Sequence, residues 1–379
     1  MTAAVLTRLP RRLRGVTLVE LMIAMALGLV LALAMASLQL SVTRSSTDVS
    51  RTTGMLETAR VVLQLMADDL SQAGFWGGYV PEFDNLTFSG VPSDPPTALP
   101  DPCLAYSATN WNATYLRNLF GVPALSGATA PGTCDTLVTQ AQANSDVLVV
   151  RRVSSCAVGE AGCEATATED ALYHSVNLCS TVSTTHLLAS TGHAALLARD
   201  CTTPAAQRRL LSSLWWVRDH AVSDGDGIPT LMRSSLGVSS STPTQGAGEV
   251  VAEGVQALRV EWGIDNVSKS GGAVNFSQAV AWVSGQEFRQ ATNRGDGAPD
   301  GADVHCDTTT PCTVDQMSNA VTATLYVLVR SVAPVDGYTD TRTYQLGGAT
   351  LGPFNDRFQR KVFSTTVRLA NVSGRRETP

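Results

Sequence analysis

Residues 14–38 read RGVTLVELMIAMALGLVLALAMASL, and this stretch decides the architecture of the 379-residue chain. From Leu21 to Leu38 every side chain is apolar or small, and these 18 residues, extended a little at each end, reach the ~20 that a helix needs to cross a bilayer. The residues before the span carry no acid and four arginines, which are Arg8, Arg11, Arg12 and Arg14. Because positive charge holds its end of a membrane helix in the cytoplasm, the rest of the chain is predicted to lie on the other side.

A cleaved secretory signal peptide is the ordinary alternative for such an N-terminus. Ala34-Met35-Ala36 followed by Ser37 offers a candidate cleavage site. However, the apolar run is longer than the about 7–15 residues usual in a signal peptide. Glu20 also places a carboxylate at the edge of the span, and an acid deep in a membrane helix costs ~2.5–3.5 kcal/mol on insertion scales. A discarded segment has no need of such a residue, so Glu20 is predicted to have a partner.

The sequence from Arg14 to Met22 resembles the class III leader of type IV pilins and pseudopilins. In that leader a short basic segment ends in glycine, and glutamate is the fifth residue of the mature chain. The resemblance implies that a prepilin peptidase cuts between Gly15 and Val16 and methylates the new amine of Val16. Phenylalanine is more usual after the cut, so Val16 departs from the pattern. The resemblance further implies that Glu20 meets the free amine of a neighbouring subunit, each charge offsetting the burial of the other.

Beyond the membrane the helix is predicted to continue. Its apolar residues recur at steps of three and four, the period of one helical face, at Leu56, Ala59, Leu63, Met66, Leu70 and Ala73. Gly74 then provides a natural helix stop. This face is expected to pack on the chain's own head, and a coiled coil with another protein is the alternative. The chain thus divides into a leader at 1–15, a transmembrane half of the helix at 16–40, an amphipathic half at 41–73 and a head at 74–379.

The head is predicted to be mostly antiparallel sheet, so the fold class is α+β: a long N-terminal helix, half of it transmembrane, and a β-rich head. Residues 81–145 are rich in Pro, Gly, Ser, Thr and Asn, and we interpret them as an irregular insertion. Strand-like runs follow at 146–153, 210–218, 249–262, 320–332 and 361–372. Trp215 and Trp216 are adjacent, so a strand would point one into the core and leave the other half-covered or exposed as a contact.

Eight cysteines follow the membrane segment: Cys103, Cys134, Cys156, Cys163, Cys179, Cys201, Cys306 and Cys312. An even number behind an export-like N-terminus predicts disulfides in an oxidising compartment. Because short loops cost least entropy to close, the favoured bonds are Cys156–Cys163 and Cys306–Cys312, followed by Cys103–Cys134 and Cys179–Cys201. A zinc site built from cysteines with His174, His186 or His193 is the alternative, but the chain has no Cys-x-x-Cys and its spacings are irregular.

Composition and motifs argue against several function classes. The 27 Lys and Arg against 33 Asp and Glu give a net charge of -6, which does not suit a nucleic-acid partner. Lys269 and Lys361 are the two lysines, and neither follows glycine, so the chain has no Gly-Lys-Ser/Thr phosphate loop. His-Glu-x-x-His and Gly-x-Ser-x-Gly are also missing from the sequence. We therefore expect no catalysis and no required cofactor.

Five stretches in the C-terminal part carry a second resemblance: 260–265 (VEWGID), 318–321 (SNAV), 326–331 (YVLVRS), 338–340 (YTD) and 356–367 (DRFQRKVFSTTV). They are similar to the PilW family of large type IV pilus minor pilins. The family implies an inner-membrane protein with a periplasmic head, which helps to start pilus assembly. Its implied partners are other minor pilins, the major pilin and a tip adhesin, and its implied final place is the pilus tip at the cell surface.

Two acidic turns could supply the oxygen ligands that calcium prefers. They contain Asp224 and Asp226 in one run, and Asp296, Asp300 and Asp303 in another. Neither run has the EF-hand spacing, because Ile228 and Ala298 stand where acids should be. Asp-Gly sequences are in the first place typical of tight turns, with or without a metal. The acidic turn expected after Asp265 is replaced by 266–272 (NVSKSGG), which argues against calcium there as well.

These observations predict a structural subunit of a type IV pilus that primes assembly through Gly15, Val16, Glu20 and the surfaces of its head. A type II secretion pseudopilin would share the leader, and a secreted disulfide-rich adhesin or binding protein cut after Ala36 is the alternative from another class. The long head and the C-terminal resemblance favour the pilus. A solvated strand face is expected to carry the basic residues near the C-terminus, with an acidic partner as the alternative: Arg357, Arg360, Lys361, Arg368, Arg375 and Arg376.

Overall fold

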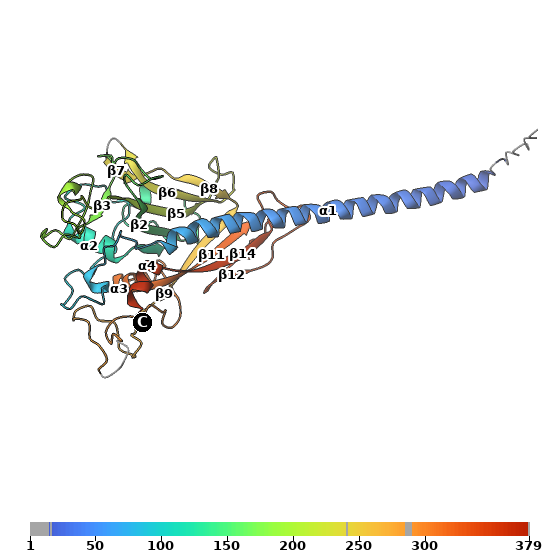
Figure 1. The fold of residues 1–379 in the computed structure, drawn as a ribbon. Coiled ribbons are helices and arrows are strands. Elements are labelled where there is room, and N and C mark those ends of the chain that lie inside the picture. The colour runs from blue at the N-terminus through green and yellow to red at the C-terminus, as the bar shows by residue number, and fades with distance from the viewer. Residues whose placement is uncertain (1–14, 16, 240–241, 285–289, 378–379) are drawn as a thin grey trace, which may run out of the picture. The chain divides into compact units, whose positions relative to one another are not determined.

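The long helix α1, Leu18–Ser71, opens the fold (Figure 1). The structure, a computed structural model, describes residues 15, 17–239, 242–284 and 290–377. It contains two units, Met1–Gly54 and Met55–Pro379, and α1 begins in the first and ends in the second. In the first unit the large apolar side chains between Leu18 and Val49 that the structure describes are 54–74 % exposed. Their segment has a mean hydropathy of 2.5, so by length and composition this helix can cross a membrane.

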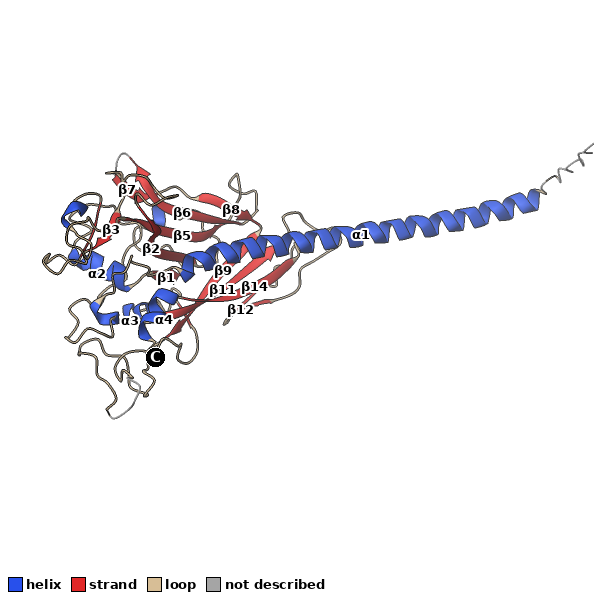
Figure 2. Ribbon diagram, viewed as in Figure 1, coloured by secondary structure: helices blue, strands red, loops and turns tan. Residues whose placement is uncertain are grey.

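The described part of the second unit contains two main antiparallel sheets, so the expected α+β class is confirmed (Figures 1 and 2). The larger sheet has the order β1-β2-β5-β3-β4, with β6 pairing β5, β7 and β8. Its strands are β1 Ala124–Gly127, β2 Val147–Ala157, β3 Tyr173–Val176, β4 His186–Ala189, β5 Arg208–Arg218, β6 Thr230–Ser239, β7 Thr242–Gln245 and β8 Glu249–Glu253. The smaller sheet has the order β10-β9-β11-β14, with bounds β9 Val255–Ile264, β10 Val304–His305, β11 Ala320–Arg330 and β14 Arg360–Arg368. A separate hairpin joins β12 Tyr344–Leu346 to β13 Ala349–Leu351.

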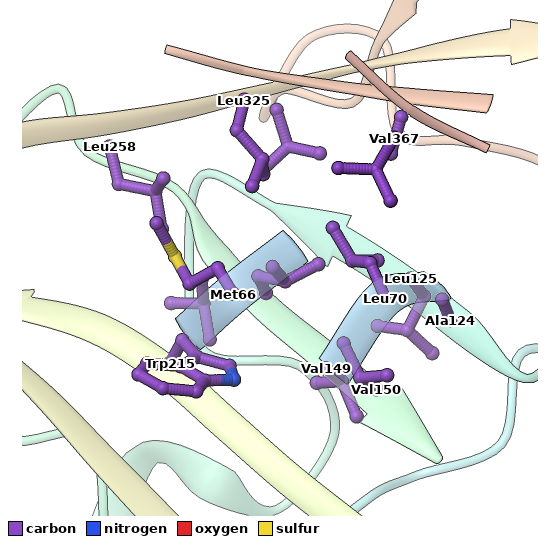
Figure 3. Close-up of a cluster of buried hydrophobic side chains, with 14 of the residues drawn as sticks. Met66, Leu70, Ala124, Leu125, Val149, Val150, Trp215, Leu258, Leu325 and Val367 are labelled. Carbon is purple, nitrogen blue, oxygen red and sulfur yellow. The ribbon is translucent and has the colours of Figure 1, made fainter. Parts of the chain in front are cut away.

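The C-terminal part of α1 forms the centre of the head's core. Figure 3 shows Met66 and Leu70 between Trp215 and Val149 of the larger sheet and Leu325 of the smaller one. The buried face of the helix comprises Met55, Ala59, Val62, Met66, Leu70 and Ala73. The expectation that this part packs on the chain's own head is therefore confirmed. One expected position was wrong, because Met55 lies on the buried face where Leu56 was predicted, and Leu56 is 44 % exposed. Leu63 is partly buried and packs against the core, as expected, beside the fully buried Val62.

A buried polar contact fixes the end of α1 to the larger sheet. The Asp69 carboxylate accepts hydrogen bonds from Arg152 Nε at 3.4 Å and from Trp215 Nε1 at 3.2 Å. The helix then stops before Gly74, whose φ of +74° is the left-handed conformation that glycine adopts most easily. The Gly74 N–H donates a hydrogen bond to the Arg151 carbonyl of β2 at 3.1 Å, which joins the chain after the helix to the larger sheet. The expected stop at Gly74 thus adds a backbone bond to β2 next to the side-chain bond between Asp69 and Arg152.

The run predicted as one strand over 249–262 is divided at Gly254 between the two sheets. β8 before it belongs to the larger sheet and β9 after it to the smaller one. Gly254 has a φ of +81°, and a Cβ there would lie 2.8 Å from the Arg330 carbonyl oxygen. A left-handed residue pressed against β11 therefore turns the chain from one layer to the other.

Two other expectations about local structure were partly wrong. The strand predicted over 361–372 ends at Arg368, and the short helix α4, Ala370–Arg376, follows it. The insertion at 81–145 is not irregular throughout, because it contains η1 Glu82–Asp84, α2 Ala113–Gly121, β1 and η2 Cys134–Thr136. Asn112 caps α2 by accepting hydrogen bonds from the Thr114 and Tyr115 N–H groups, both at 3.0 Å. Two further short helices lie elsewhere in the head: η3 His193–Ala195 and α3 Val314–Ser318.

Both tryptophans of β5 are buried, so the prediction that one would be half-covered was wrong. Trp215 and Trp216 are 1 % and 2 % exposed. Trp215 faces the α1 side of the sheet through its bond to Asp69. The other ring is covered by the chain around Gly248, where a Cβ would lie 2.4 Å from the Trp216 ring. The loop before β8 thus closes the second face of the sheet.

Disulfides join the pairs that loop closure favoured. The bonds are Cys103–Cys134, Cys156–Cys163, Cys179–Cys201 and Cys306–Cys312. Within the described residues no cysteine is left free. Three of the four bonds lie before residue 202, in the segment of the head that precedes the central strand β5.

Candidate functional site

The predicted cleavage point lies where the described part of the chain begins. Gly15 is exposed, and a Cβ built on it would meet no atom within 4 Å. Packing in the described structure therefore does not require glycine here, in contrast to Gly254. A requirement for a small residue at this position must come from outside the fold, as processing by a peptidase would provide. Val16, the predicted mature N-terminus, lies outside the described residues.

Thr17 and Glu20 form a reciprocal capping box at the start of α1. The Glu20 Oε2 atom accepts hydrogen bonds from the Thr17 N–H at 3.0 Å and from the Thr17 hydroxyl at 2.9 Å. The Thr17 Oγ1 atom in turn accepts from the Glu20 N–H at 3.2 Å. These bonds satisfy N–H groups that the start of a helix leaves without intrahelical partners. The signal was present in the sequence as Thr-x-x-Glu before an apolar run, and the sequence-based prediction did not use it.

The capping box gives Glu20 a local role beside the predicted docking role. Its side chain is exposed and lies at the positive end of the α1 dipole, where a negative charge is favoured. A carboxylate has lone pairs for several hydrogen bonds. Glu20 can therefore accept a bond from the amine of another subunit while it still holds the start of its own helix.

The carboxylates proposed as calcium ligands are bonded to the chain itself. Asp226 accepts from the N–H groups of Ile228 at 2.9 Å and Val222 at 2.8 Å, and these bonds hold the pKa of its carboxyl below the ordinary range. In the second turn, Asp300 accepts from two backbone N–H groups, Asp296 from the Ala298 N–H, and Asp303 from the Thr324 hydroxyl. Asp224 instead lies with Asp219 and His220, whose ligand atoms are all within 4.8 Å of one another. The acidic turns thus have structural roles of the kind expected for Asp-Gly sequences.

The three histidines considered as zinc ligands lie together without the cysteines. His174 Nε2 is 3.2 Å from His186 Nδ1, and His193 bonds to the Ser175 hydroxyl at 2.9 Å. Because the eight cysteines are all in disulfides, none offers a thiolate to a metal. Burial lowers the pKa of His174 to about 3 and that of His186 to about 4, so both rings are neutral at pH 7.

The prediction that the basic residues near the C-terminus lie on a solvated strand face was wrong for some of them. Arg360 is buried, and its Nη1 and Nη2 atoms bond to Asp340 at 2.9 Å and to Asp356 at 2.6 Å. Asp340 is fully buried and also accepts the Tyr344 hydroxyl at 2.8 Å. The stretches 338–340 and 356–367, which carried the second resemblance, therefore meet in one ion-pair network. Charges buried together in this way are costly to separate, because each would be left without a partner.

Arg376 of α4 is the centre of a second buried network. Its Nε atom donates to Asp84 at 2.8 Å, and its Nη1 atom to Asp265 at 3.2 Å and to Asn319 at 2.8 Å. The neighbouring Arg375 bonds to Asp84 at 3.3 Å and to the Gly74 carbonyl at 2.5 Å. We call Arg375, Arg376, Asp84 and Asp265 the C-terminal clasp. It ties the last described helix to the segment that follows α1.

Comparison with known proteins identifies both ends of the chain. A family model described as Type IV Pilus-assembly protein W matches residues 215–371. The chain contains a PilW domain. This PilW domain begins in β5 and ends in α4, so it includes β9, β11 and β14 of the smaller sheet and the network around Arg360. A second model, the Prokaryotic N-terminal methylation motif, matches residues 10–36, which include Gly15, Glu20 and most of the apolar run. The predicted PilW resemblance and prepilin leader are confirmed.

Other comparisons add little to the PilW assignment. Among solved structures, a type IV-like pilin from Thermus thermophilus matches with 13% sequence identity and a TM-score of 0.23, covering 61% of this chain and 80% of that chain. No curated protein matches the chain. The PilW domain and the methylation motif leave residues 37–214 unmatched, and this part contains α2, the strands β1 to β4, the first part of β5, and the three histidines His174, His186 and His193.

Proposed function

We propose that the protein is a minor pilin that primes the assembly of a type IV pilus and takes a place at or near its tip. The observation that carries the proposal is the presence of a prepilin motif, with Glu20 at the start of α1, in one chain with a PilW domain. The leader and the apolar helix fit a membrane-anchored, pilus-associated protein. The protein would be held in the inner membrane by α1, with its head in the periplasm, and would act without catalysis.

The chemistry of the N-terminal segment suggests how such a subunit works. A prepilin peptidase would remove the four leader arginines at Gly15 and leave α1 free to move out of the membrane. Glu20 would then pair with the amine of a neighbouring subunit, which lowers the cost of keeping both charges in an apolar helix bundle. Other minor pilins, the major pilin and a tip adhesin are the proposed partners. No nucleic-acid partner is proposed, because the chain has a net charge of -6.

Two competing proposals, a type II secretion pseudopilin and a secreted adhesin, differ from this one in the secretion or pilus system to which the protein belongs or in the residue at which the mature chain begins. A type II secretion pseudopilin would share the cut at Gly15, and the match to a pilus-assembly family favours the pilus over it. A secreted adhesin would be cut after Ala36 and would lose Glu20 with the capping box. The match of the methylation motif, which ends at residue 36, favours retention of the apolar helix.

The mass of the mature N-terminal peptide tests the processing step. We expect N-methylated Val16 in the wild type, and an uncut chain with its leader in a Gly15→Val variant, because the peptidase needs a small residue before the cut. Gly28→Ala is the matched control, since a Cβ at Gly28 also meets no atom within 4 Å and the cut should be unchanged. A mature chain that begins at Ser37, or normal cutting of Gly15→Val, would contradict the proposal.

Deletion of the gene tests the priming step. A strain that lacks the protein should make and process its major pilin normally but should assemble few surface pili, and the wild-type gene should restore them. Electron microscopy of negatively stained cells gives the pilus count. Normal piliation of the deletion strain, with loss of protein secretion instead, would favour the pseudopilin.

A further inference from the structure

A cavity of about 360 Å³ lies in the part of the head that neither family model covers. Its walls come from the chain that follows α1 (Tyr79), from Asp94, from α2 (Arg117 and Phe120) and from the start of β4 (His186). This volume is at the lower end of the ~300–1,000 Å³ range of small-molecule sites in proteins. We propose that this cavity is a carbohydrate-binding site that takes a neutral sugar ring.

The apolar wall of the cavity is a packed aromatic surface. The rings of Tyr79 and His186 have centroids 4.0 Å apart, those of Phe120 and His186 are 4.9 Å apart, and those of Tyr79 and Phe120 are 5.2 Å apart. Because the rings contact one another, they leave no space between them for an ammonium group, as an aromatic cage would. Phe120 meets the other two rings edge-on, at 67° to Tyr79 and 88° to His186, and the uncovered parts of the three rings form an apolar wall against which the C–H face of a sugar ring can lie. His186 is neutral at pH 7, so the surface carries no charge.

A hydrogen-bond acceptor and a hydrogen-bond donor, Asp94 and Arg117, also line the cavity. The Asp94 carboxylate is oriented by the Glu82 N–H at 2.6 Å and the Phe83 N–H at 2.9 Å, and it keeps lone pairs for further hydrogen bonds. Arg117 donates from Nη2 to the Thr97 hydroxyl at 3.1 Å, and its guanidinium also lines the cavity. The lining of the cavity therefore includes an oriented carboxylate acceptor and a guanidinium donor.

This combination selects among ligand classes. An inorganic anion would be repelled by Asp94, and a simple cation by Arg117, because both charges line the same cavity. A wholly apolar ligand would displace water from the carboxylate and the guanidinium and would offer neither group a hydrogen bond in return. A sugar satisfies both, since its hydroxyls donate to Asp94 and accept from Arg117 while its apolar face covers the aromatic rings.

Disulfides hold the walls of the cavity in place before any ligand arrives. The helix α2, with Arg117 and Phe120, lies inside the loop closed by Cys103–Cys134. His186 lies inside the loop closed by Cys179–Cys201. Walls that are already ordered lose little conformational freedom on binding, which favours affinity for a small ligand. The inference does not depend on the pilus role, because the cavity lies outside the PilW domain and the methylation motif.

The test uses the full chain in a detergent without a sugar headgroup, applied to an array of immobilised mono- and disaccharides of glucose, galactose, mannose and their N-acetylated amines. We expect at least one saccharide to be retained, and Arg117→Gln to lower the affinity for it by about tenfold or more through loss of a charged donor. Arg199→Gln is the matched control: it removes an exposed arginine outside the cavity and should leave binding unchanged.

A second pair of variants examines the aromatic surface. Tyr79→Phe keeps the ring and should bind as the wild type does, whereas Tyr79→Ala should lose binding while its near-ultraviolet circular dichroism shows a folded head. Arg117→Gln should also assemble pili normally, which separates this site from the proposed function. Retention of no saccharide, or retention that Arg117→Gln leaves unchanged, would overturn the proposal. Specific cross-linking of a pilin peptide to Tyr79, in place of sugar binding, would overturn it as well.

Discussion

A single substitution can separate the capping role of Glu20 from the docking role proposed for it. Glu20→Gln keeps an oxygen that can accept from the Thr17 N–H, so the capping box can still form, but it removes the charge. We expect Glu20→Gln to insert and be cut normally, because loss of the acid eases insertion by about 2–3 kcal/mol. Co-purification with other pilins should nevertheless fall as far as it does in Glu20→Ala. The measurement is the amount of each pilin recovered with the tagged protein from membranes.

The matched control for this experiment is Glu57→Gln, which removes an exposed acid farther along the same helix. It should leave co-purification and pilus number unchanged. If Glu20→Gln behaved like this control and only Glu20→Ala were defective, the capping box would be the important role and subunit docking would not.

The neutral histidines beside the cavity predict a pH dependence of stability. Burial lowers the pKa of His186 to about 4, whereas the unfolded chain binds a proton near the ordinary histidine value of about 6.5. Between these values the unfolded state carries more protons than the folded state, so the free energy of unfolding falls as the pH falls. In His186→Gln the free energy of unfolding should depend less steeply on pH between pH 6 and 4.5, because the unfolded chain then takes up about one proton fewer. Denaturant unfolding of the disulfide-bonded chain at several pH values measures the slope, and equal slopes would contradict the assignment.

At the scale of whole elements, the C-terminal clasp is expected to contribute strongly to holding α4. Arg376→Ala would leave Asp265 buried without its cation and Asp84 with Arg375 alone, and breaking a buried pair in this way costs ~3–5 kcal/mol. The exposed pair of Arg357 with Asp336 provides a control, since Arg357→Ala should cost only ~0–1 kcal/mol. Unfolding in denaturant gives both values. A cost for Arg376→Ala no larger than that of the control would show that α4 is held by apolar packing.

The elements that the sequence predicted are those with local signals. The apolar period of α1 was visible because neighbouring turns share one face, although Met55 takes the place predicted for Leu56 and Val62 is more deeply buried than Leu63. The cysteine pairs followed from short loop lengths. The membrane segment and Glu20 were recognised because apolar length and charge are properties of the sequence itself.

The elements that the sequence did not predict depend on distant partners. Arg376 looked like a solvated residue because its acid, Asp84, is 292 positions away. The helix α4 was mistaken for the end of a strand because an alternating pattern does not show that Arg375 and Arg376 must point back to the end of α1. The cavity could not be foreseen either, since Tyr79, Arg117 and His186 come together only when α2 and β4 are folded.

At the scale of the molecule, the size of the head predicts where the subunit sits in a pilus. For the predicted head at 74–379, compact-globule scaling gives a radius of gyration of ~19 Å, against ~13 Å for a head of 100 residues. Helices in a bundle pack at about 8–10 Å, so heads of this size would collide with lateral neighbours along a shaft. Immunogold labelling of intact pili should therefore find the protein at filament ends, in few copies. Regular labelling along the shaft would contradict this prediction.

The C-terminal clasp also sets an order in time. In the export that we propose, the head would reach the periplasm from its N-terminal end, so Gly74 and Asp84 would emerge long before Arg375 and Arg376 could reach them. Until those residues arrive, Asp84 and Asp265 would lack the arginines of the clasp. A chain that stops before Arg375 would therefore bury these carboxylates without their cations, however well its membrane helix is inserted. We expect such incomplete heads to be less stable than complete ones, which would favour the complete heads for entry into a filament.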